Sequence, residues 1–561
     1  MQMRRTAFCL ATCLGYADAD GAQCRSSISC FQPDSCPAGQ RCKSAHTDYR
    51  QDCGMGCGFC ACKTPGPPPV APPVAVKIDG SSAAHRTAAS FLGVNLDSSR
   101  IATLDYDDPI LLKLASRFGG STFRVGGTEA DLLYYNISGS SSSPPWAPDH
   151  IVNRNDTLDV RVWDRLYNFS RAADLKLLYD LNAMGSRRTD NTWDSTNAEQ
   201  LLAHIKSAGY HTQGVLAGFQ FGNEPFLDGW MKTTHKVSGL QLAKDLRALH
   251  GLIAAHNLSS ALPVLQGPDE ACVGSTDYWK NKVSCIPDQA HFAEFVPGAS
   301  TVASSLSFHF YRFSGSGGCK LSAEDLIDVD KLGDYSAISV YMNAAKDLGH
   351  GDVPMVLSET SAVSCGGCKG VSDTFVHSLW FVDLLGRAVS KYRLHQLYRQ
   401  ALFGPDAYAL VQTANGRFAR VTPDYFAALL WSRLVGSTIL GVTGGGGNLR
   451  LHAACSRTTA GGVAVVYANW APTPVNVTLS ADASGSVYSG WREEFHLTPT
   501  TGGLSSHDVS LNGGGALGVE SDLTPQLVRP TVGNHGVVTL AGYSLGFIVL
   551  LNASALACAT V

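Results

Sequence analysis

Short apolar runs alternate with amphipathic stretches over the central part of the chain. Six runs rich in apolar residues have the length and composition of buried strands: residues 122–125, 175–181, 218–222, 263–267, 305–311 and 354–358. Apolar residues at helical spacing between these runs predict helices, among them residues 198–208, 238–255 and 374–390. Strand–helix alternation from about residue 76 to 440 predicts an α/β architecture, and its length suits a (β/α)8 TIM barrel.

The pattern changes after residue 440. Glycine-rich turns at residues 443–447 and 513–515 separate runs of apolar and β-branched residues at 463–468, 475–479 and 545–551. This texture predicts a C-terminal β-sandwich over residues 441–561. We therefore expect the barrel at residues 76–440, with the first of these residues either in the barrel or in a strand of the sandwich.

A cysteine-rich region precedes the barrel. Eight cysteines lie between Cys24 and Cys62, which predicts a small disulfide-rich module at residues 20–64, and the proline-rich residues 65–75 predict a stiff linker. A zinc site at Cys57 and Cys60 is the weaker alternative, because no histidine pair or second Cys-x-x-Cys follows at finger spacing. The module either attaches the chain to a polysaccharide or a surface, or is only a stabilised appendage.

The N-terminus and the charge balance bear on the compartment and the partners. Residues 1–19 have the basic start, short apolar run and small-x-small end of a signal peptide, with a disordered start as the alternative. With the cysteine usage, they predict a secreted or extracellular protein, or one of a lysosome- or vacuole-like compartment. No later stretch is apolar enough to span a bilayer, so no transmembrane segment is expected. The net charge of -4 lacks the basic excess typical of nucleic-acid binders.

Two glutamates stand at the ends of predicted barrel strands. Glu224 follows the run 218–222, and Glu359 directly follows the run 354–358. Because the C-terminal ends of barrel strands face one active site, we expect both carboxyl groups to converge. Two unrelated acids in surface loops are the alternative.

Glycosidic hydrolysis needs such a pair of carboxyl groups. One protonates the leaving oxygen, and the other attacks the anomeric carbon or activates a water. A separation of about 5–5.5 Å gives retention, whereas a wider gap admits a water and gives inversion. The barrel carries no metal-site spacing, and hydrolysis of this kind uses no cofactor, so we expect neither.

Segments spread over more than 400 residues carry a family resemblance. They are residues 123–128 with Asp131, then 180–183, 209–210, 222–225, 267–269, 309–311, 358–361, 372–375, 399–400 and 424–425. In these the chain resembles glycoside hydrolase family 79, the family of the heparanase-like β-glucuronidases. The resemblance implies a retaining β-glucuronidase that acts on a polysaccharide, proteoglycan or glycoconjugate, with Glu224 as acid/base and Glu359 as nucleophile.

The same resemblance implies further roles. Eight positions match residues that bind the sugar or line the site: Asn223, Asp97, Thr128, His309, Tyr311, Gly366, Gln400 and Tyr408. Asn223 would hold the 2-hydroxyl, and Tyr408 with the amides around Gly366 would hold the carboxylate. Tyr311 would hydrogen-bond Glu359, and a purely structural histidine is the alternative for His309. The matching pair Cys455 and Cys558 would form a disulfide.

Two features depart from the family near the predicted site. Cys365 and Cys368 flank the glycines of the carboxylate-binding loop, where they can pair with each other, or one of them with Cys319. A redox interpretation of this Cys-x-x-Cys lacks a thioredoxin-like context. Asp406 stands where the family has a glycine, and its charge would oppose a nearby uronate unless the side chain faces away.

Other departures concern the substrate and processing. Residues 270–295 carry scattered rather than clustered lysines, and Arg187 with Arg188 is the one compact basic pair near the predicted site, which an ordinary solvated pair explains equally well. Heparan sulfate is therefore not the expected substrate. Only residues 136–160 intervene where some relatives carry a long excised segment, so activation by internal excision is not expected.

Two other functions stay open on the sequence. The first is another retaining exo-β-glycosidase, of the glucosidase or xylosidase type. The second is a non-catalytic secreted polysaccharide-binding protein, against which the presence of both Glu224 and Glu359 argues.

Overall fold

The structure is a computed structural model that describes residues 17–18, 21–24, 41–44, 60–63, 72–137, 157–225, 236–272, 286–316, 318–328, 335–481, 486–530 and 536–559. The chain divides into two compact units, Met1–Pro72 and Pro73–Val561. The signal-peptide cleavage, the disulfides of the cysteine-rich module and most of the linker lie outside the described residues. So do most of residues 136–160 and half of residues 270–295, on which the processing and basic-cluster predictions rest.

The first unit contains four short strands in an antiparallel sheet of order β1-β2-β4-β3. They are β1 (Ala17–Asp18), β2 (Gly21–Cys24), β3 (Arg41–Ser44) and β4 (Cys60–Lys63). Three of them contain or end at cysteines of the predicted module.

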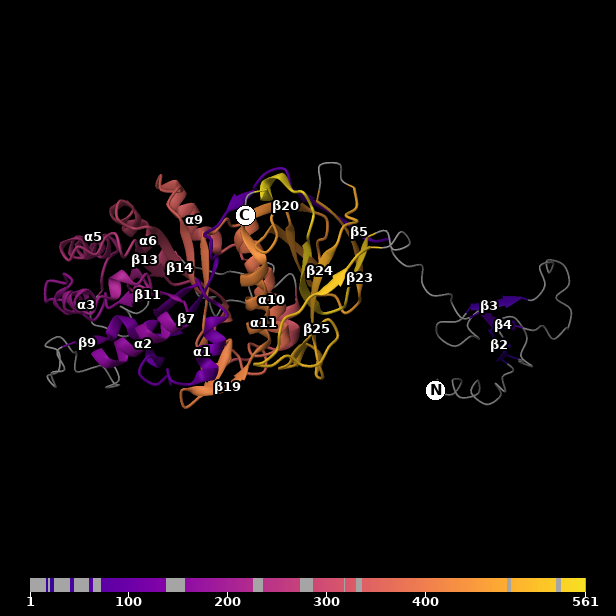
Figure 1. Ribbon diagram of the computed structural model, residues 1–561, viewed down its shortest axis with the longest axis horizontal. Coiled ribbons are helices and arrows are strands. Elements are labelled where there is room, and N and C mark those ends of the chain that lie inside the picture. Colours follow the sequence, from indigo (N-terminus) through magenta and orange to yellow (C-terminus); the bar gives the residue numbers. More distant parts are fainter. Residues whose placement is uncertain are drawn as a thin grey trace, which may run out of the picture. The chain divides into compact units, whose positions relative to one another are not determined.

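Eight parallel strands close a barrel in the second unit, which confirms the predicted fold class (Figure 1). They are β7 (Leu92–Asp97), β8 (Thr122–Gly126), β11 (Lys176–Leu181), β12 (Leu216–Phe221), β13 (Val264–Glu270), β14 (Ser305–Phe313), β15 (Met355–Val363) and β16 (Gln396–Arg399). Six of the eight coincide with predicted strands. The apolar pattern does not single out β7 and β16, because a glycine and an asparagine interrupt β7 and because β16 has only four residues.

Helices follow the barrel strands along the chain. They are α1 (Pro109–Ser116), α2 (Val160–Ala172), α3 (Thr196–Ser207), α5 (Gly239–Ala255), α6 (Ile286–Ala299), α7 (Ala323–Ile327), α9 (Ile338–Asp347), α10 (Phe375–Ser390) and α11 (Pro423–Leu434). Some of their starts carry capping side chains: Asp108 accepts from Ile110 N at 2.8 Å before α1, and Ser238 accepts from Gln241 N at 3.2 Å before α5. Short 3-10 helices are η1 (Ser98–Arg100), η2 (Thr128–Leu132), η3 (Tyr210–Thr212), η5 (Gly503–Ser505) and η6 (Leu556–Cys558).

The strands of the C-terminal domain, two of which precede the barrel in the chain, form one large, mainly antiparallel sheet that folds over its own core. They are β5 (Val74–Asp79), β6 (His85–Arg86), β20 (Val435–Thr443), β21 (Leu449–Ser456), β22 (Val463–Asn469), β23 (Val475–Ser480), β24 (Arg492–Pro499), β25 (Val509–Leu511), β26 (Gln526–Val528), β27 (Val537–Leu540) and β28 (Ser544–Leu550). Side chains of β5, β23 and β27 share one buried apolar cluster with those of β21, β22 and β28, as the two layers of a sandwich do. A Cys455–Cys558 disulfide closes this domain, which confirms the predicted bridge.

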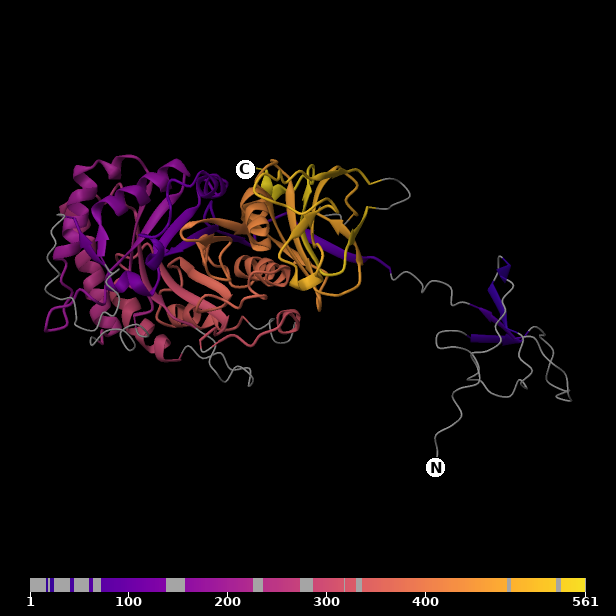
Figure 2. The same ribbon diagram turned by 90° about the horizontal axis from the view of Figure 1, so that it is seen from below.

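Helices α10 and α11 lie between the barrel and the C-terminal sheet (Figures 1 and 2). Almost every residue of α10 is buried, because the helix contacts β15 of the barrel on one side and β20, β21, β22 and β28 on the other. A helix that is apolar all round is the pattern expected for such a doubly covered position. Two small sheets complete the unit: β9 (Tyr134–Asn136) with β10 (Thr157–Asp159), and β17 (Phe403–Gly404), β18 (Val411–Ala414) and β19 (Arg417–Val421).

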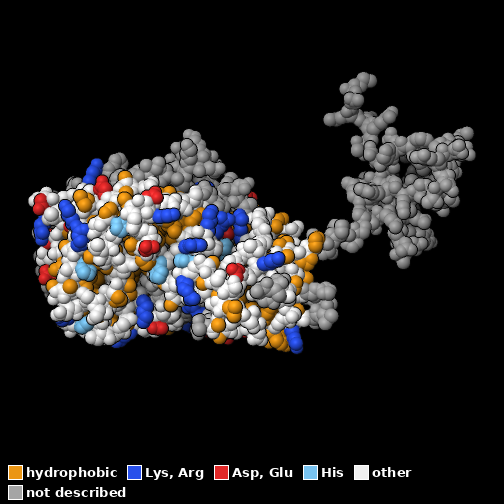
Figure 3. All heavy atoms as spheres, turned by 90° about the horizontal axis from the view of Figure 1, so that it is seen from above, with side chains coloured by type: hydrophobic (Ala, Val, Ile, Leu, Met, Phe, Trp, Pro, Cys, Tyr) orange, Lys and Arg blue, Asp and Glu red, His pale blue; other side chains and the backbone are white. Residues whose placement is uncertain are grey.

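The surface carries mixed charge. On the face shown in Figure 3, lysine and arginine side chains are spread out, with aspartate and glutamate among them. Within the described ranges, no helix combines the length and the apolar character needed to cross a membrane.

Candidate active site

The two predicted catalytic glutamates occupy different kinds of position on the barrel. Glu224 follows β12 in a left-handed backbone conformation (φ 45°), and its N–H donates to Asp269 O at 2.9 Å. Glu359 lies inside β15 rather than at its end, which corrects the sequence-based placement. The strand pairing is shifted there on both sides of β15, between Phe308 and His309 of β14 and between Leu357 and Thr360 next to β16. Such bulges re-aim a side chain without ending the strand.

The Glu359 carboxylate is held by two donors. Arg124 Nη1 donates to its Oε2 at 2.7 Å, and the Tyr311 hydroxyl donates to its Oε1. Burial, together with the charge of Glu359, raises the pKa of Tyr311 well above its usual value, so the phenol keeps its proton. A carboxylate that accepts at both oxygens is held in one orientation.

Arg124 is a fully buried hub at the centre of these contacts. Its guanidinium donates to Asn223 Oδ1 at 2.8 Å, to the side-chain oxygen of Gln220 and to Asp269, in addition to Glu359. Burial by itself would lower the pKa of Arg124, but the charges of Asp269 and Glu359 outweigh it and raise that pKa. One planar cation therefore sets the relative positions of Asn223 and Glu359.

His309 connects Glu224 to this hub. Its Nδ1 lies 2.9 Å from Glu224 Oε1, and its Nε2 lies 2.8 Å from Asp269 Oδ2. Burial opposes the charged imidazole, but Asp269 and Glu359 outweigh burial and raise the pKa of His309 well above its usual value. Burial likewise opposes ionisation of Asp269, whereas Arg124 and His309 lower its pKa to about 2. His309 thus contacts a predicted catalytic group directly.

The two glutamates converge on shared neighbours. His309 is hydrogen-bonded to Glu224, and the charge of Glu359 also raises its pKa. Tyr311 is hydrogen-bonded to Glu359, and the charge of Glu224 also raises its pKa. An unbroken series of contacts runs from Glu224 through His309, Asp269 and Arg124 to Glu359. The structure therefore brings together two carboxyl groups that are distant in the chain.

Further predicted residues lie around Glu359. Asp97 caps η1 by accepting from Ser99 N at 3.0 Å, and burial, Glu129 and Glu359 raise its pKa to about 7. Burial and the charges of Asp97, Asp406 and Glu359 raise the pKa of Tyr408 well above its usual value.

Two other positions that the family resemblance predicts to contact the sugar ring, Gln400 and Thr128, differ in exposure. The Gln400 side chain is buried and hydrogen-bonded to Tyr408. Thr128 is half-buried at the start of η2, after Gly127, whose positive φ of 101° lets the backbone pass close to Asp97.

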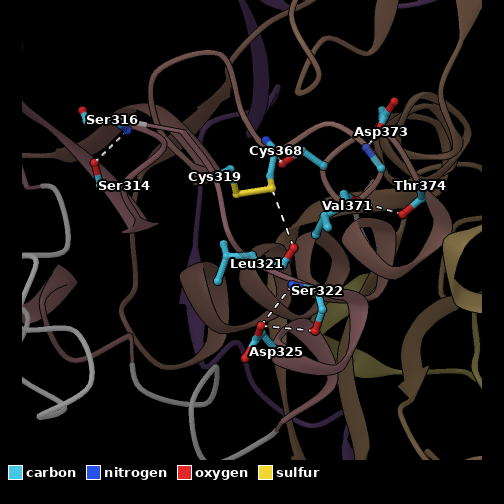
Figure 4. Close-up of a disulfide and its surroundings, with 12 residues drawn as sticks. Ser314, Ser316, Cys319, Leu321, Ser322, Asp325, Cys368, Val371, Asp373 and Thr374 are labelled. Carbon is cyan, nitrogen blue, oxygen red and sulfur yellow. Dashed lines mark hydrogen bonds between the residues drawn. A yellow bond between two sulfur atoms is a disulfide. The ribbon is translucent and has the colours of Figure 1, made fainter.

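The loop that contains Gly366 is tied down by a disulfide. Cys365, Gly366 and Gly367 all have positive φ, a conformation that glycine adopts freely and cysteine rarely does. Cys368 is paired with Cys319, and its Sγ lies 3.9 Å from Leu321 O (Figure 4). The structure thus selects this pairing over Cys365–Cys368, and Cys365 is an exposed free thiol.

Two polar residues differ from the sequence-based expectation. Asp406 does not face away from the loop: a Cβ atom placed on Gly366 would lie 3.2 Å from Asp406 Oδ1. Arg187 is not part of a solvated basic pair, because it is buried, donates to Ala183 O at 2.7 Å and forms an ion pair with Asp245. Arg188 alone is exposed, beside Asp194 at 3.5 Å. Among the described residues, Arg187 and Arg188 therefore do not form a basic patch.

Sequence reasoning assigned no role to Arg124 or Asp269. Both stood inside segments that carried the family resemblance, but a charged residue within an apolar strand is itself a signal. A buried arginine in a barrel strand needs carboxylate partners, and clusters of buried ionisable groups are most common at functional sites. Within the described ranges, no group of three or more His, Cys, Asp or Glu side chains is arranged to hold a metal ion.

Comparisons with known proteins identify the family of the chain and its fold. The family model described as "Glycosyl hydrolase family 79, N-terminal domain" matches residues 93–386, more than half of the chain. The chain is 26% identical to a hyaluronoglucuronidase of Hirudo nipponia over 525 residues, which covers 86% of this chain and 99% of that protein. It is 26% identical to heparanase of Mus musculus, with 84% and 91% covered. An α-L-arabinofuranosidase structure from Thermotoga maritima shares the fold, with a TM-score of 0.57 at 11% identity and coverage of 85% and 99%.

Proposed function

The chain belongs to glycosyl hydrolase family 79 and is a glycoside hydrolase, and from this premise we propose that it cleaves β-linked glucuronides with retention of configuration. The name of the Hirudo nipponia relative, a hyaluronoglucuronidase, supports the sugar. The arrangement around Glu224 and Glu359 supports the double displacement. The substrate would be a polysaccharide, proteoglycan or glycoconjugate that carries β-linked glucuronic acid.

In the first step, Glu359 would act as the nucleophile. Its carboxylate attacks the anomeric carbon while Glu224 gives a proton to the glycosidic oxygen, the bond to the aglycone breaks, and the aglycone leaves as an alcohol. The sugar is then held as an ester of Glu359. Arg124 and Tyr311 fix this carboxylate, and each oxygen of a carboxylate offers two acceptor positions, so a lone pair stays available for the attack.

In the second step, Glu224 would act as a base. Its carboxylate takes a proton from a water, the water oxygen attacks the same carbon, and the ester to Glu359 breaks. A cationic His309 donates to Glu224 Oε1, so Oε2 is left to carry the transferred proton. The same hydrogen bond stabilises the Glu224 carboxylate after the proton has been given to the aglycone. Two inversions at one carbon give net retention.

Sugar recognition would come from the residues around Glu359. Asn223 would hold the 2-hydroxyl, in a position that Arg124 fixes through Oδ1. Asp97, Thr128 and Gln400 would contact the ring, and Tyr408 with the amides around Gly366 would hold the sugar carboxylate. The family membership supports these roles, and so do the charge interactions of Asp97 and Tyr408 with Glu359.

The single observation that carries this proposal is the shared hydrogen-bonded network, which holds both carboxyl groups at once. The test is to trap the enzyme with a mechanism-based β-glucuronyl label and to map the labelled peptide. The expected label is on Glu359, with loss of activity in proportion to labelling. A label on another residue would overturn the nucleophile assignment.

A paired substrate assay tests the choice of sugar. We expect a higher kcat/KM for an aryl β-glucuronide than for the matched aryl β-glucoside or β-xyloside. A preference for the glucoside or xyloside would replace the proposal by another retaining exo-β-glycosidase. Absence of turnover on all three, with the fold intact, would favour a polysaccharide-binding protein.

A further inference from the structure

The charges around Glu359 are mostly negative on the side where Asp97 and Tyr408 lie. Asp97 and Asp406 both contribute to the raised pKa of Tyr408, and Glu359 contributes as well. A substrate with an anionic group would meet this negative field, which disfavours it by Coulomb repulsion in a partly desolvated site. To offset this repulsion, a cation near Tyr408 and the amides around Gly366 must be open to the substrate.

The two cations nearest to Glu359 do not meet that requirement. Arg124 and His309 are both completely buried, and carboxylates and amides of the protein already engage them. Arg100 differs, because 37% of its side chain is exposed. It is the last residue of η1, the short helix that Asp97 caps, so the fold places it beside the residues that surround Glu359.

The guanidinium of Arg100 is only loosely used by the protein. Its Nη2 lies 3.3 Å from Asp406 Oδ2, at the long end for an ion pair of this type. Its Nε–H is buried and has no hydrogen-bond partner among the described residues. A buried donor without a partner carries a free-energy cost that a suitable acceptor would remove. The exposed part of the guanidinium keeps N–H donors that can bind a carboxylate.

Asp406 links Arg100 to the glycine loop. Its Oδ1 lies next to Gly366, and the N–H of Ala407 donates to Gly366 O at 2.8 Å. Asp406 thus connects Arg100 with the loop that contains Gly366. Without Arg100, the same carboxylate would repel an anionic group bound there.

We infer that Arg100 adds a charged contact to the carboxylate of the sugar, beside Tyr408 and the amides around Gly366, with Asp406 as the counter-ion that positions it. The inference rests on the proposed β-glucuronidase function and adds a specificity-determining residue to it. When the sugar binds, its carboxylate would share the guanidinium with Asp406 and accept from the N–H groups that Asp406 leaves unused. A neutral glucoside would gain nothing from Arg100.

The test compares kcat/KM for an aryl β-glucuronide and the matched aryl β-glucoside in Arg100 and Asp406 variants. Arg100→Gln should lower the glucuronide/glucoside ratio about tenfold or more, because a charge-assisted hydrogen bond is lost and Asp406 is left unpaired. Arg100→Lys should retain more of the ratio than Arg100→Gln, since it keeps the charge. Asp406→Asn should raise the ratio, because it removes a repulsive charge while the amide oxygen can still accept from Arg100 and hold it in place.

A double variant and a matched control complete the design. Arg100→Gln combined with Asp406→Asn should restore part of the ratio that Arg100→Gln loses. Arg165→Gln is the control, because Arg165 is also half-exposed and also lies 3.0 Å from an aspartate, Asp107, but belongs to the outer helix α2. It should leave the ratio unchanged.

Two outcomes separate this inference from the proposed function. If the wild-type enzyme prefers the glucoside, the proposed function fails. If the wild-type enzyme prefers the glucuronide but Arg100→Gln leaves the ratio unchanged, or lowers both substrates equally, only the role of Arg100 fails. An Asp406→Asn variant with a lower ratio would equally overturn the counter-ion role.

Discussion

The interior of the barrel and the core of the C-terminal sandwich are built on opposite principles. The sandwich cluster consists mainly of apolar side chains from β5, β20 to β23, β27 and β28, and its stability comes from removing them from water. The barrel interior instead buries Arg124, Asp180, Asp269 and His309 with no exposure to solvent. Burying charges costs free energy unless each one finds partners.

Asp180 shows that the cost in the barrel is real. Both of its carboxyl oxygens are buried without a hydrogen-bond partner among the described residues, and its nearest cation is Arg124 Nη2 at 3.5 Å. Burial raises the pKa of Asp180 well above its usual value, although Arg124 acts against this. The comparison teaches that the barrel gives up stability to position a network of charges, whereas the sandwich core is mainly apolar and buries only the smaller charged pair of Arg492 and Glu494, beside the half-buried His496, among the described residues.

The largest expected effect is the loss of turnover in Glu359→Gln. Removal of the nucleophile abolishes the covalent route, so kcat for an aryl β-glucuronide should fall by several orders of magnitude. Glu494→Gln is the matched control, because Glu494 is a buried glutamate of β24 that accepts from His496 at 2.8 Å in the sandwich. Its kcat should stay within about twofold of wild type. Activity retained in Glu359→Gln would contradict the mechanism.

Replacement of a buried arginine should separate stability from activity. Arg124→Met and Arg492→Met each leave a carboxylate without its cation, so the free energy of unfolding should fall by about 3–5 kcal/mol in both. Only Arg124→Met should also lower kcat per folded molecule. Denaturant unfolding and kinetics corrected for the folded fraction measure the two effects.

A conservative variant, Arg124→Lys, distinguishes a loss of activity from a loss of folding in that experiment. Arg124→Lys keeps the charge and should retain more stability than Arg124→Met, but an ammonium group cannot contact Asn223, Asp269 and Glu359 together. It should therefore lose activity. Full activity in Arg124→Lys would show that the guanidinium does not position the catalytic groups.

Removal of the sandwich disulfide should affect stability, whereas removal of the barrel disulfide should affect substrate binding. Cys455–Cys558 closes a span of 103 residues in the sandwich, so the double Ala variant should lose roughly 2–5 kcal/mol of stability with kcat unchanged. Cys319–Cys368 holds the loop of Gly366, so its double Ala variant should raise KM for the glucuronide. Equal KM values in the two variants would argue against a role of this loop in binding.

The smallest expected effect is on the alkaline side of the pH profile. Burial, Glu129 and Glu359 raise the pKa of Asp97 to about 7, so Asp97 is neutral below that pH and becomes charged above it. A charged Asp97 repels an anionic sugar, so kcat/KM for the glucuronide should fall as the pH rises through about 7. Asp97→Asn should weaken this fall, and the glucoside should show less of it. An unchanged profile in Asp97→Asn would assign the fall to another group.

Much of the fold was predictable because it depends on local patterns. Six of the eight barrel strands and the helices at residues 198–208, 238–255 and 374–390 follow from the spacing of apolar residues. The β-rich texture after residue 440 likewise predicts the sandwich. The short strand β16 escaped, because four residues carry too little periodicity, and its place in the sheet comes from pairing with β15 and β7.

The candidate site was predictable only in part. Glu224 and Glu359 follow from their position after apolar strands and from the family resemblance. Their partners do not, because the contacts of Arg124 with Asp269 and Glu359 join residues more than a hundred positions apart. The shift of strand register that places Glu359 inside β15 also has no local signature.

The sequence alone determined the alternation of strands and helices, the sandwich and the two glutamates, because each of these is encoded by neighbouring residues. The tertiary structure decided which cation holds Glu359, which cysteine pairs with Cys368 and which way Asp406 points. Closing a barrel brings distant strand ends within hydrogen-bonding distance, and only that closure fixes which charges meet.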